Sequence, residues 1–214
     1  RPGADAVPLD EELRRVLPVI EALGGRPVSV DTSKAEVARR AVALGAEMVN
    51  DVTAFRGDPA LAGIVAESGV YTCLMHMRGV PRTMQEDPRY DDVVSEVKAF
   101  LEERLAFAVA QGVREDRVCL DPGIGFGKTL EQNVDLIAHL DQLQTLGLPV
   151  LLGASRKSMI DKIMPTPPQR RLPGTLAVHS IGIWRGADII RAHDVAEAVQ
   201  AARITDRLLE RSVR

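Results

Sequence analysis

The sequence predicts an α/β fold in which helices separate the strands of a parallel sheet. Short β-branched runs recur along the chain, and each is followed by a polar loop and then by a segment with apolar residues at helical spacing. Strands that are buried on both faces and separated by helices are typical of a parallel sheet. A leading helix followed by six strand–helix units accounts for the whole pattern.

The first part of the pattern begins with a helix over 9–23, where leucine, valine and isoleucine recur at helical spacing. Pro18 lies inside this segment and should kink or split the helix, because proline removes a backbone donor. Strands are then expected at 27–30 and 48–50. Both are short and β-branched, as strands of a buried sheet are.

The helices beside these strands are predicted from their end signals. Ser33 and Glu36 form a capping-box pair for a helix that Gly45 ends. Pro59 follows an aspartate and occupies the first position of the next helix, which Gly69 closes.

The later units continue in the same order. Strands are expected at 70–75, 117–121, 148–153 and 187–194, and helices at 91–111, 131–146 and 174–185 and after Asp194. The helix at 91–111 places Val94, Val97, Leu101, Leu105 and Ala108 on one stripe. Asp194 and Glu197 are expected to cap the last helix. The segments 76–90 and 165–174 are expected to be loops.

The length, 214 residues, fits one large domain over 1–214. The parallel sheet could be doubly wound or closed as a (β/α)8 TIM barrel. A complete barrel uses ~250 residues, so about one and a half strand–helix units would be missing before Arg1. The chain is therefore expected to be a fragment that lacks the N-terminal part of its domain.

Composition excludes several function classes. The formal net charge of −3 disfavours a general nucleic-acid binder, and 3% aromatic residues leave few platforms for base stacking. No apolar run reaches the ~18–20 residues that span a bilayer. Cys73 and Cys119 lie inside apolar runs, which favours buried free thiols in a reducing compartment over a disulfide. The composition predicts a cytoplasmic protein with neither nucleic-acid nor membrane partners.

The stretch DPGIGFGKT is one residue short of a phosphate-binding P-loop. Pro122 stands where the first glycine of that motif belongs, and Asp121 before it would place a negative charge beside the phosphate. The glycines are better suited to let the backbone lie close beside a flat ring. Lys128 is then expected to be a loop lysine without a catalytic role.

Every predicted strand ends at a polar or functional side chain. These residues are Asp31, Asn50 and Asp51, Met75 and His76, Asp121, the run Ser155–Lys157, and Arg191 with His193. A single one could be a helix cap, but together they favour a shared pocket at the carboxyl edge of the sheet.

The chemistry of this set divides in two. Asp31, Asn50 and Asp121 offer acceptors that suit an amino-amidine edge of a flat heterocycle. Lys157 and the other cations suit an anionic group, most plausibly phosphate. A polyphosphate ester of a nitrogen heterocycle matches both halves.

The motifs together resemble the dihydropteroate synthase family. They are RPGA at 1–4, SVDTSK at 29–34, VND at 49–51, CLMHMRGVPRTMQ at 73–85, LDPGIGFGK at 120–128, GASRKSMI at 153–160 and IIRAHDV at 189–195. The resemblance runs in order along the whole chain. It implies a (β/α)8 barrel that joins a dihydropterin pyrophosphate to p-aminobenzoate and releases pyrophosphate in folate biosynthesis, and a target of sulfonamides.

The resemblance also implies residue roles. Asp121 and Asn50 would hold the amino-pyrimidine edge of the pterin, and Asp31 would lie on the same ring system. Lys157 would reach the pterin carbonyl and ring nitrogen, and Arg191 would lie against the ring and near the pyrophosphate. Asp31, Asp121 and Lys157 are the residues expected to be catalytic.

The remaining implied contacts concern the pyrophosphate and the p-aminobenzoate. Arg1 and His193 would bind the pyrophosphate. Ser155 and Arg156 would help to hold p-aminobenzoate, with Pro2 nearby. Further pocket residues implied by the resemblance are Met75, Gly125 and Phe126.

The implied reaction breaks the bond between the methylene carbon and the phosphate oxygen, and the aniline nitrogen then attacks the methylene. Carboxylates would stabilise positive charge on the pterin, while cations stabilise the departing pyrophosphate. The family uses Mg²⁺ to neutralise that group. No metal ligand is expected within this chain, since the family's asparagine ligand would precede Arg1.

Three alternatives stay open. Lys157 could be a Schiff-base lysine of a barrel aldolase, the chain could be a pterin-dependent methyltransferase, or it could be a non-catalytic pterin-binding fragment or scaffold. His139 and His179 are expected to be surface or packing residues, without zinc spacing. The resemblance implies a homodimer through the last helices, where Trp184 could pack.

Overall fold

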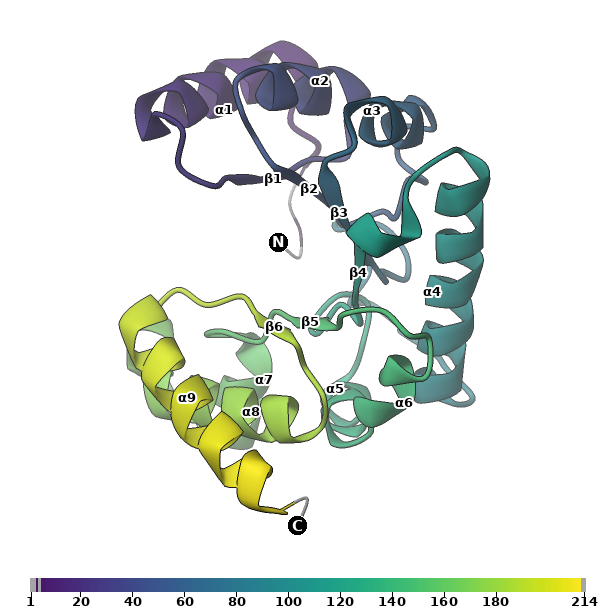
Figure 1. Ribbon diagram of the computed structural model, residues 1–214. Helices are drawn as coiled ribbons and strands as arrows, with labels where there is room; N and C mark the ends of the chain where they lie inside the picture. The colour runs from purple at the N-terminus through teal and green to yellow at the C-terminus, as the bar shows by residue number, and fades with distance from the viewer. Residues whose placement is uncertain (1–2, 4, 213–214) are drawn as a thin grey trace.

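The structure is a computed structural model that describes Gly3 and residues 5–212. In this part of the chain six short strands alternate with helices, and the strands lie at the centre with the helices outside them (Figure 1). The strands are β1 (Ser29–Asp31), β2 (Met48–Asp51), β3 (Tyr71–Met75), β4 (Val118–Asp121), β5 (Leu151–Leu152) and β6 (Ile189–Ile190). The predicted alternation of strands and helices is confirmed.

The described strands form an arc in chain order. The order in the first sheet is β1-β2-β3-β4, and β5 pairs with β6. A parallel bridge between Leu120 of β4 and Val150 joins the two groups. A doubly wound sheet reverses its strand order at a switch point, and the described strands show no such reversal. The arc has the order of a (β/α)8 barrel and is open between β1 and β6 (Figure 1).

The helices pack around the outside of this arc (Figure 1). They are α1 (Leu9–Leu23), α2 (Ala35–Ala43), α3 (Ala60–Ser68), α4 (Val93–Ala110), α5 (Leu130–Ala138), α6 (Asp141–Gln144), α7 (Ser158–Ile163), α8 (Leu172–Trp184) and α9 (Val195–Ser212). Two 3-10 turns, Glu115–Arg117 and Pro168–Arg170, precede β4 and α8. Helix α7 lies between the predicted strand at 148–153 and the proline-rich loop, in a segment for which the sequence predicts no helix.

Helix α4 illustrates how the core is built. Its predicted stripe is buried at Val94, Val97, Leu101 and Ala108, while Leu105 is half-buried. Each fully buried aliphatic side chain of this kind contributes about 1.5–3 kcal/mol to folding. Arg104 also turns inward, where its Nε donates to the carbonyl of Ala54 at 2.8 Å. The stripe fixes α4 against the strands and so fixes the strand ends.

Two helix features differ from the prediction. Pro18 does not split helix α1, which continues through it; Pro18 is exposed, so that the carbonyl left without a donor can face water. Helix α2 begins at Ala35 after Lys34, and Ser33 does not cap it. Instead Asp58 accepts from the Ala35 backbone N–H at 2.9 Å. A capping acceptor from a distant loop was not visible in the local pattern.

Other boundaries also differ. The helix predicted over 131–146 is broken after Ala138, and α6 begins at Asp141. Strands β5 and β6 are much shorter than expected. The Asp188 carboxylate accepts from the Val150 N–H at 2.8 Å and takes the place of a strand carbonyl there. By contrast, the predicted end of α3 is confirmed, with Gly69 in the left-handed region as its C-cap, while the helix begins at Ala60 and Pro59 is its N-cap, one residue before the predicted position.

Cys73 and Cys119 lie opposite each other on β3 and β4, and both are buried free thiols, as predicted. The hydrogen bond with Cys119 and burial raise the pKa of Cys73, so its thiol stays protonated. Among the described residues, no helix is long and apolar enough to cross a membrane.

Candidate active site

The strand register brings the predicted acidic residues to one edge of the sheet. Asp31 pairs with Asn50 across β1 and β2, and Met75 pairs with Asp121 across β3 and β4. The Asn50 Nδ2 donates to Asp31 Oδ1 at 2.7 Å. The Asn50 Oδ1 is buried and has no hydrogen-bond partner among the described residues. A buried acceptor of this kind is costly unless a ligand supplies its donor.

Arg191 joins the two carboxylates from the far end of the arc. Its Nη2 lies 3.4 Å from Asp121 Oδ2, and its Nη1 lies 3.9 Å from Asp31 Oδ1. Asp121 is only 1% exposed, and burial raises its pKa, while Arg191 and the Gly123 N–H oppose the rise. The structure thus brings β1, β4 and β6 together at one set of charges.

Lys157 lines the same cavity as Asp31 and Arg191. Its Nζ is 4.2 Å from the centre of the Phe126 ring, a cation–π contact. Burial lowers the pKa of Lys157, and Asp121 opposes the shift. A Cβ on Gly125 would lie 3.4 Å from Lys157 Cδ, so the glycine loop (residues 122–127) lies directly against this side chain.

Ser155 and His193 form a pair beside these charges. The His193 backbone N–H donates to Ser155 Oγ at 3.2 Å, and His193 Nδ1 lies 2.9 Å from the same oxygen. A cavity of about 400 Å³ opens here. It is lined by Asp31, Gly153, Ser155, Lys157, Arg191, Ala192 and His193. Residues from three separate strand ends therefore share one pocket. Asn50, Met75 and Asp121, which the sequence also assigns to it, are buried and do not line this cavity.

Arg156 takes a different direction from its neighbours. Its Nε donates to Asp194 Oδ2 at 3.0 Å, and this pairing lowers the pKa of Asp194. Asp194 directly precedes α9, at the predicted cap position, and its carboxylate is paired with Arg156. Arg156 has φ +56°, a left-handed conformation that is strained for a side chain other than glycine. The Arg156 N–H donates to Thr175 Oγ1 at 3.0 Å.

Met75 and Phe126 lie close to the strand ends. Met75 is fully buried at the end of β3 and clusters with Met77 and Met84, and Phe126 packs against this cluster. Arg1 and Pro2, which the sequence also assigns to the pocket, lie outside the described residues.

Asp51 and His76 end their strands, yet both are used internally. The buried Asp51 carboxylate accepts from the Thr53 and Phe55 N–H groups at 2.8 and 2.7 Å. It closes the turn after β2. The His76 ring packs edge-on against Phe100 with centroids 4.8 Å apart. Strand-end position alone did not distinguish these residues from those that line the pocket.

Lys128 was predicted as a plain loop lysine, and this description is incomplete. It is only 1% exposed, and its Nζ contacts His76, Gly123 and Phe126. Its sequence neighbours gave no signal of burial, because two of these contacts depend on how the glycine loop folds back.

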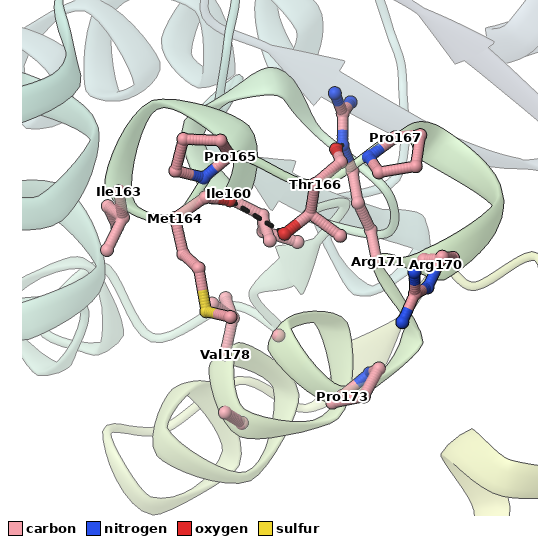
Figure 2. A pocket seen from close by; sticks show the side chains of 12 residues that line it. Ile160, Ile163, Met164, Pro165, Thr166, Pro167, Arg170, Arg171, Pro173 and Val178 are labelled. Atoms are coloured by element: carbon pink, nitrogen blue, oxygen red, sulfur yellow. Dashed lines mark hydrogen bonds between the residues drawn. The ribbon is translucent and has the colours of Figure 1, made fainter.

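A larger cavity of about 540 Å³ lies between α7 and α8, away from the strand ends (Figure 2). Met164 and Val178 form part of its apolar wall, and Arg171 stands at its side. The Arg171 Nη1 donates to the Arg156 carbonyl at 3.1 Å, and its Nε donates to the Thr166 carbonyl. This cavity has none of the paired donors and acceptors found at the strand ends.

Comparisons with known proteins decide the family. The family described as pterin binding enzyme matches residues 1–193. The dihydropteroate synthase of Escherichia coli K12 is 45% identical over 212 residues, which are 98% of this chain and 75% of that protein. The chain belongs to the dihydropteroate synthase family. The dihydropteroate synthase of Synechocystis is 44% identical and is matched over 73% of its length.

Solved dihydropteroate synthase structures agree in fold. The Yersinia pestis enzyme in a sulfonamide drug complex matches with a TM-score of 0.95 and 43% identity, over 98% of this chain and 77% of that one. The Xanthomonas albilineans enzyme with 4-aminobenzoic acid has a TM-score of 0.91 and 47% identity, over 98% and 76%. The chain spans about three quarters of these relatives. The described arc is thus part of a (β/α)8 barrel of the dihydropteroate synthase family.

Proposed function

We infer that this chain condenses 6-hydroxymethyl-7,8-dihydropterin pyrophosphate with p-aminobenzoate to give 7,8-dihydropteroate and pyrophosphate. Family membership supports a transferase of this kind. Relatives have been solved with 4-aminobenzoic acid and with 7,8-dihydropteroate. The observation that carries the proposal is the buried Asn50 Oδ1, close to the carboxylate of Asp31 and without a donor from the described part of the chain.

The pterin edge would meet this acceptor set. The amino group and ring N–H of a pterin are donors, and they match Asn50 Oδ1 and the Asp121 carboxylate. Asp121 is already held in place by the Gly123 N–H at 2.7 Å. Lys157 would donate to the pterin carbonyl and ring nitrogen from the opposite side.

The charges around the pocket fit the bond changes. When the methylene–oxygen bond breaks, its electron pair leaves with pyrophosphate and positive charge spreads into the pterin. Asp31 and Asp121 would stabilise that charge, while Arg191 and His193 would hold the pyrophosphate. The aniline nitrogen of p-aminobenzoate then forms the new bond to carbon and loses its proton. No covalent bond to the protein is needed.

The proposed p-aminobenzoate contacts involve Ser155 and Arg156. The Ser155 hydroxyl lies in the pocket and already contacts His193. The Arg156 guanidinium is paired with Asp194, so its use by a substrate carboxylate would exchange one carboxylate partner for another. A sulfonamide that mimics p-aminobenzoate would compete for the same contacts.

Mg²⁺ remains a proposal from the family resemblance. Among the described residues, no group of three or more His, Cys, Asp or Glu side chains could hold a metal ion. The residues at hand do not fit a metal site by themselves, and no step of the reaction is assigned to the ion.

A homodimer and a cytoplasmic location are also proposed. Exposed apolar side chains on α8 and α9 support a partner surface, namely Ile181, Trp184, Val199 and Ile204. The free thiols of Cys73 and Cys119 fit a reducing compartment.

The proposal is tested by incubating the protein with dihydropterin pyrophosphate and p-aminobenzoate and measuring dihydropteroate. Formation of product that requires both substrates is expected. Pterin binding without product would favour a non-catalytic pterin-binding protein. A borohydride-trapped carbonyl adduct on Lys157 would instead favour the aldolase alternative.

A further inference from the structure

The glycine loop lies against the segment that follows β3. Gly123 has φ +70°, and a Cβ there would come within 1.9 Å of the His76 carbonyl oxygen. Gly127 has φ +65°, and a Cβ there would come within 2.4 Å of the Arg78 carbonyl oxygen. Only glycine permits both the backbone angle and the close approach at these positions. The two loops are thus packed backbone to backbone.

The side chain of Lys128 forms hydrogen bonds to both segments of this contact. Its buried Nζ donates to the carbonyls of Gly123 and Phe126, each at 3.1 Å, and to His76 Nδ1 at 2.8 Å. An ammonium group has three N–H donors, and here each has an acceptor. Lys128 therefore joins two points of the glycine loop to the end of β3.

His76 is suited to be the third acceptor. Burial and the nearby charge of Lys128 lower the pKa of His76 to about 2, so its ring is neutral. Its Nδ1 accepts from Lys128, which leaves the ring proton on Nε2. A neutral acceptor makes the ammonium form of Lys128 the form that completes the contact.

The loop that Lys128 holds carries groups of the proposed active site. The Gly123 N–H donates to Asp121, and Phe126 lies beneath the Lys157 ammonium. If the carbonyl of Gly123 or Phe126 lost its hydrogen bond to Lys128, the loop could shift and both of these contacts would be displaced. The loop is also tied by Gln85 and Asn133, which bond the carbonyl and the N–H of Gly125.

We propose that Lys128 is a positioning residue of the pterin site, whose three hydrogen bonds hold the glycine loop so that Asp121 and Phe126 meet the pterin in the right geometry. This inference rests on the proposed function. Burial lowers the pKa of Lys128 to about 7 while Asp121 opposes the shift, so the ammonium form is present at neutral pH and below. A neutral amine would have one donor fewer than it has acceptors.

The test compares Lys128→Met with Lys162→Met. Lys162 is exposed, and it lines the same cavity of about 110 Å³ as Lys128 and Lys157. Its replacement removes the same charge from the same neighbourhood but no loop contact. We expect K128M to weaken binding of dihydropterin pyrophosphate by about tenfold or more in calorimetry, since bonds to a charged donor are lost. K162M should stay within about twofold of wild type, because exposed charges are weakly coupled.

Two further readouts keep the inference falsifiable. With saturating pterin, the KM for p-aminobenzoate should change less than the pterin affinity in K128M. Hydrogen exchange at the Gly125 and Phe126 amides should accelerate about tenfold in K128M and not in K162M. If K128M does not fold, His76→Leu is the second variant, since it removes only one acceptor of Lys128. It should show the same loss of pterin affinity and the same faster exchange, each to a smaller extent.

Unchanged exchange and unchanged pterin affinity in K128M would overturn the inference, as would equal losses in K128M and K162M. A wrong proposed function would give a different result from a wrong role for Lys128. In that case wild type itself neither binds the pterin pyrophosphate nor forms dihydropteroate, and the exchange of the glycine loop still decides the role of Lys128.

Discussion

The guanidinium of Arg191 lies 3.4 Å from the buried carboxylate of Asp121, although the two residues end different strands of the arc. The contact opposes the rise in the pKa of Asp121 that burial causes. It favours the ionised form of a buried carboxylate beside a pocket that must also accept positive charge on the substrate. The basic half of the proposed site thus supports the charge of the acidic half.

Arg191→Met should therefore change the pH dependence of turnover. Without the guanidinium, burial raises the pKa of Asp121 further, so a higher pH is needed to ionise it. The acid limb of kcat/KM should move to higher pH, in addition to a loss of activity from weaker pyrophosphate binding. A pH series of steady-state rates measures both effects. An acid limb that stays in place would show that Asp121 does not control it.

Asn50→Leu should weaken pterin binding while leaving the stability of the fold nearly unchanged. The change removes a buried acceptor that has no partner among the described residues, and it also removes the Nδ2 donor to Asp31, whose exposed carboxylate can bind water instead. These two effects oppose each other, so the free energy of unfolding should change by less than about 1 kcal/mol. Pterin affinity should nevertheless fall by about tenfold or more, because the pterin loses a buried acceptor. Urea unfolding and calorimetry measure the two quantities. A large loss of stability with unchanged affinity would assign Asn50 to the scaffold instead.

His76 should make the fold sensitive to acid. Its pKa is lowered from 6.5 to about 2 in the folded protein, so below pH ~6 the unfolded chain binds a proton that the native state rejects. The free energy of unfolding should therefore decrease as the pH is lowered below ~6, by up to about 1.4 kcal/mol per pH unit. His76→Gln keeps an acceptor for Lys128 and should show a flatter decline. Urea unfolding between pH 4 and pH 7 gives both curves, and parallel curves would contradict the assignment.

Thr175→Val should disturb the loop that carries Ser155 and Lys157. Thr175 Oγ1 is the acceptor of the Arg156 N–H, and the isosteric valine leaves that donor unsatisfied next to a left-handed backbone. We expect a loss of about 1–3 kcal/mol in unfolding free energy and a higher KM for p-aminobenzoate. Thr145→Val, which changes an exposed hydroxyl near the end of α6, is the matched control. Equal effects of the two variants would refute a specific role of Thr175.

Much of the fold could be predicted because it depends on local pattern. The β-branched runs and helical stripes located every strand, and parallel register then aligned Asp31 with Asn50 and Met75 with Asp121. The shared edge of the sheet follows from this alignment. Arg191 lies near Asp121 because β5 alone separates β6 from β4 in the arc.

The rest depended on contacts between segments that are distant in sequence. The acceptors of Lys128 come together only when the glycine loop packs against the end of β3. Asp58 caps α2 from another loop, and Arg156 pairs with Asp194 across the end of the arc. No periodicity or local motif reports such pairings. For this reason the sequence assigns the cap of α2 to Ser33 and gives no sign that Lys128 is buried.

The binding of dihydropterin pyrophosphate to Asp121→Ala, measured by calorimetry, tests the central claim most directly. Asp116→Ala, which changes an exposed carboxylate just before β4, serves as the control. If one buried carboxylate anchors the pterin at the strand ends, D121A should show no detectable binding while D116A binds as wild type does. Wild-type affinity in D121A would contradict the account.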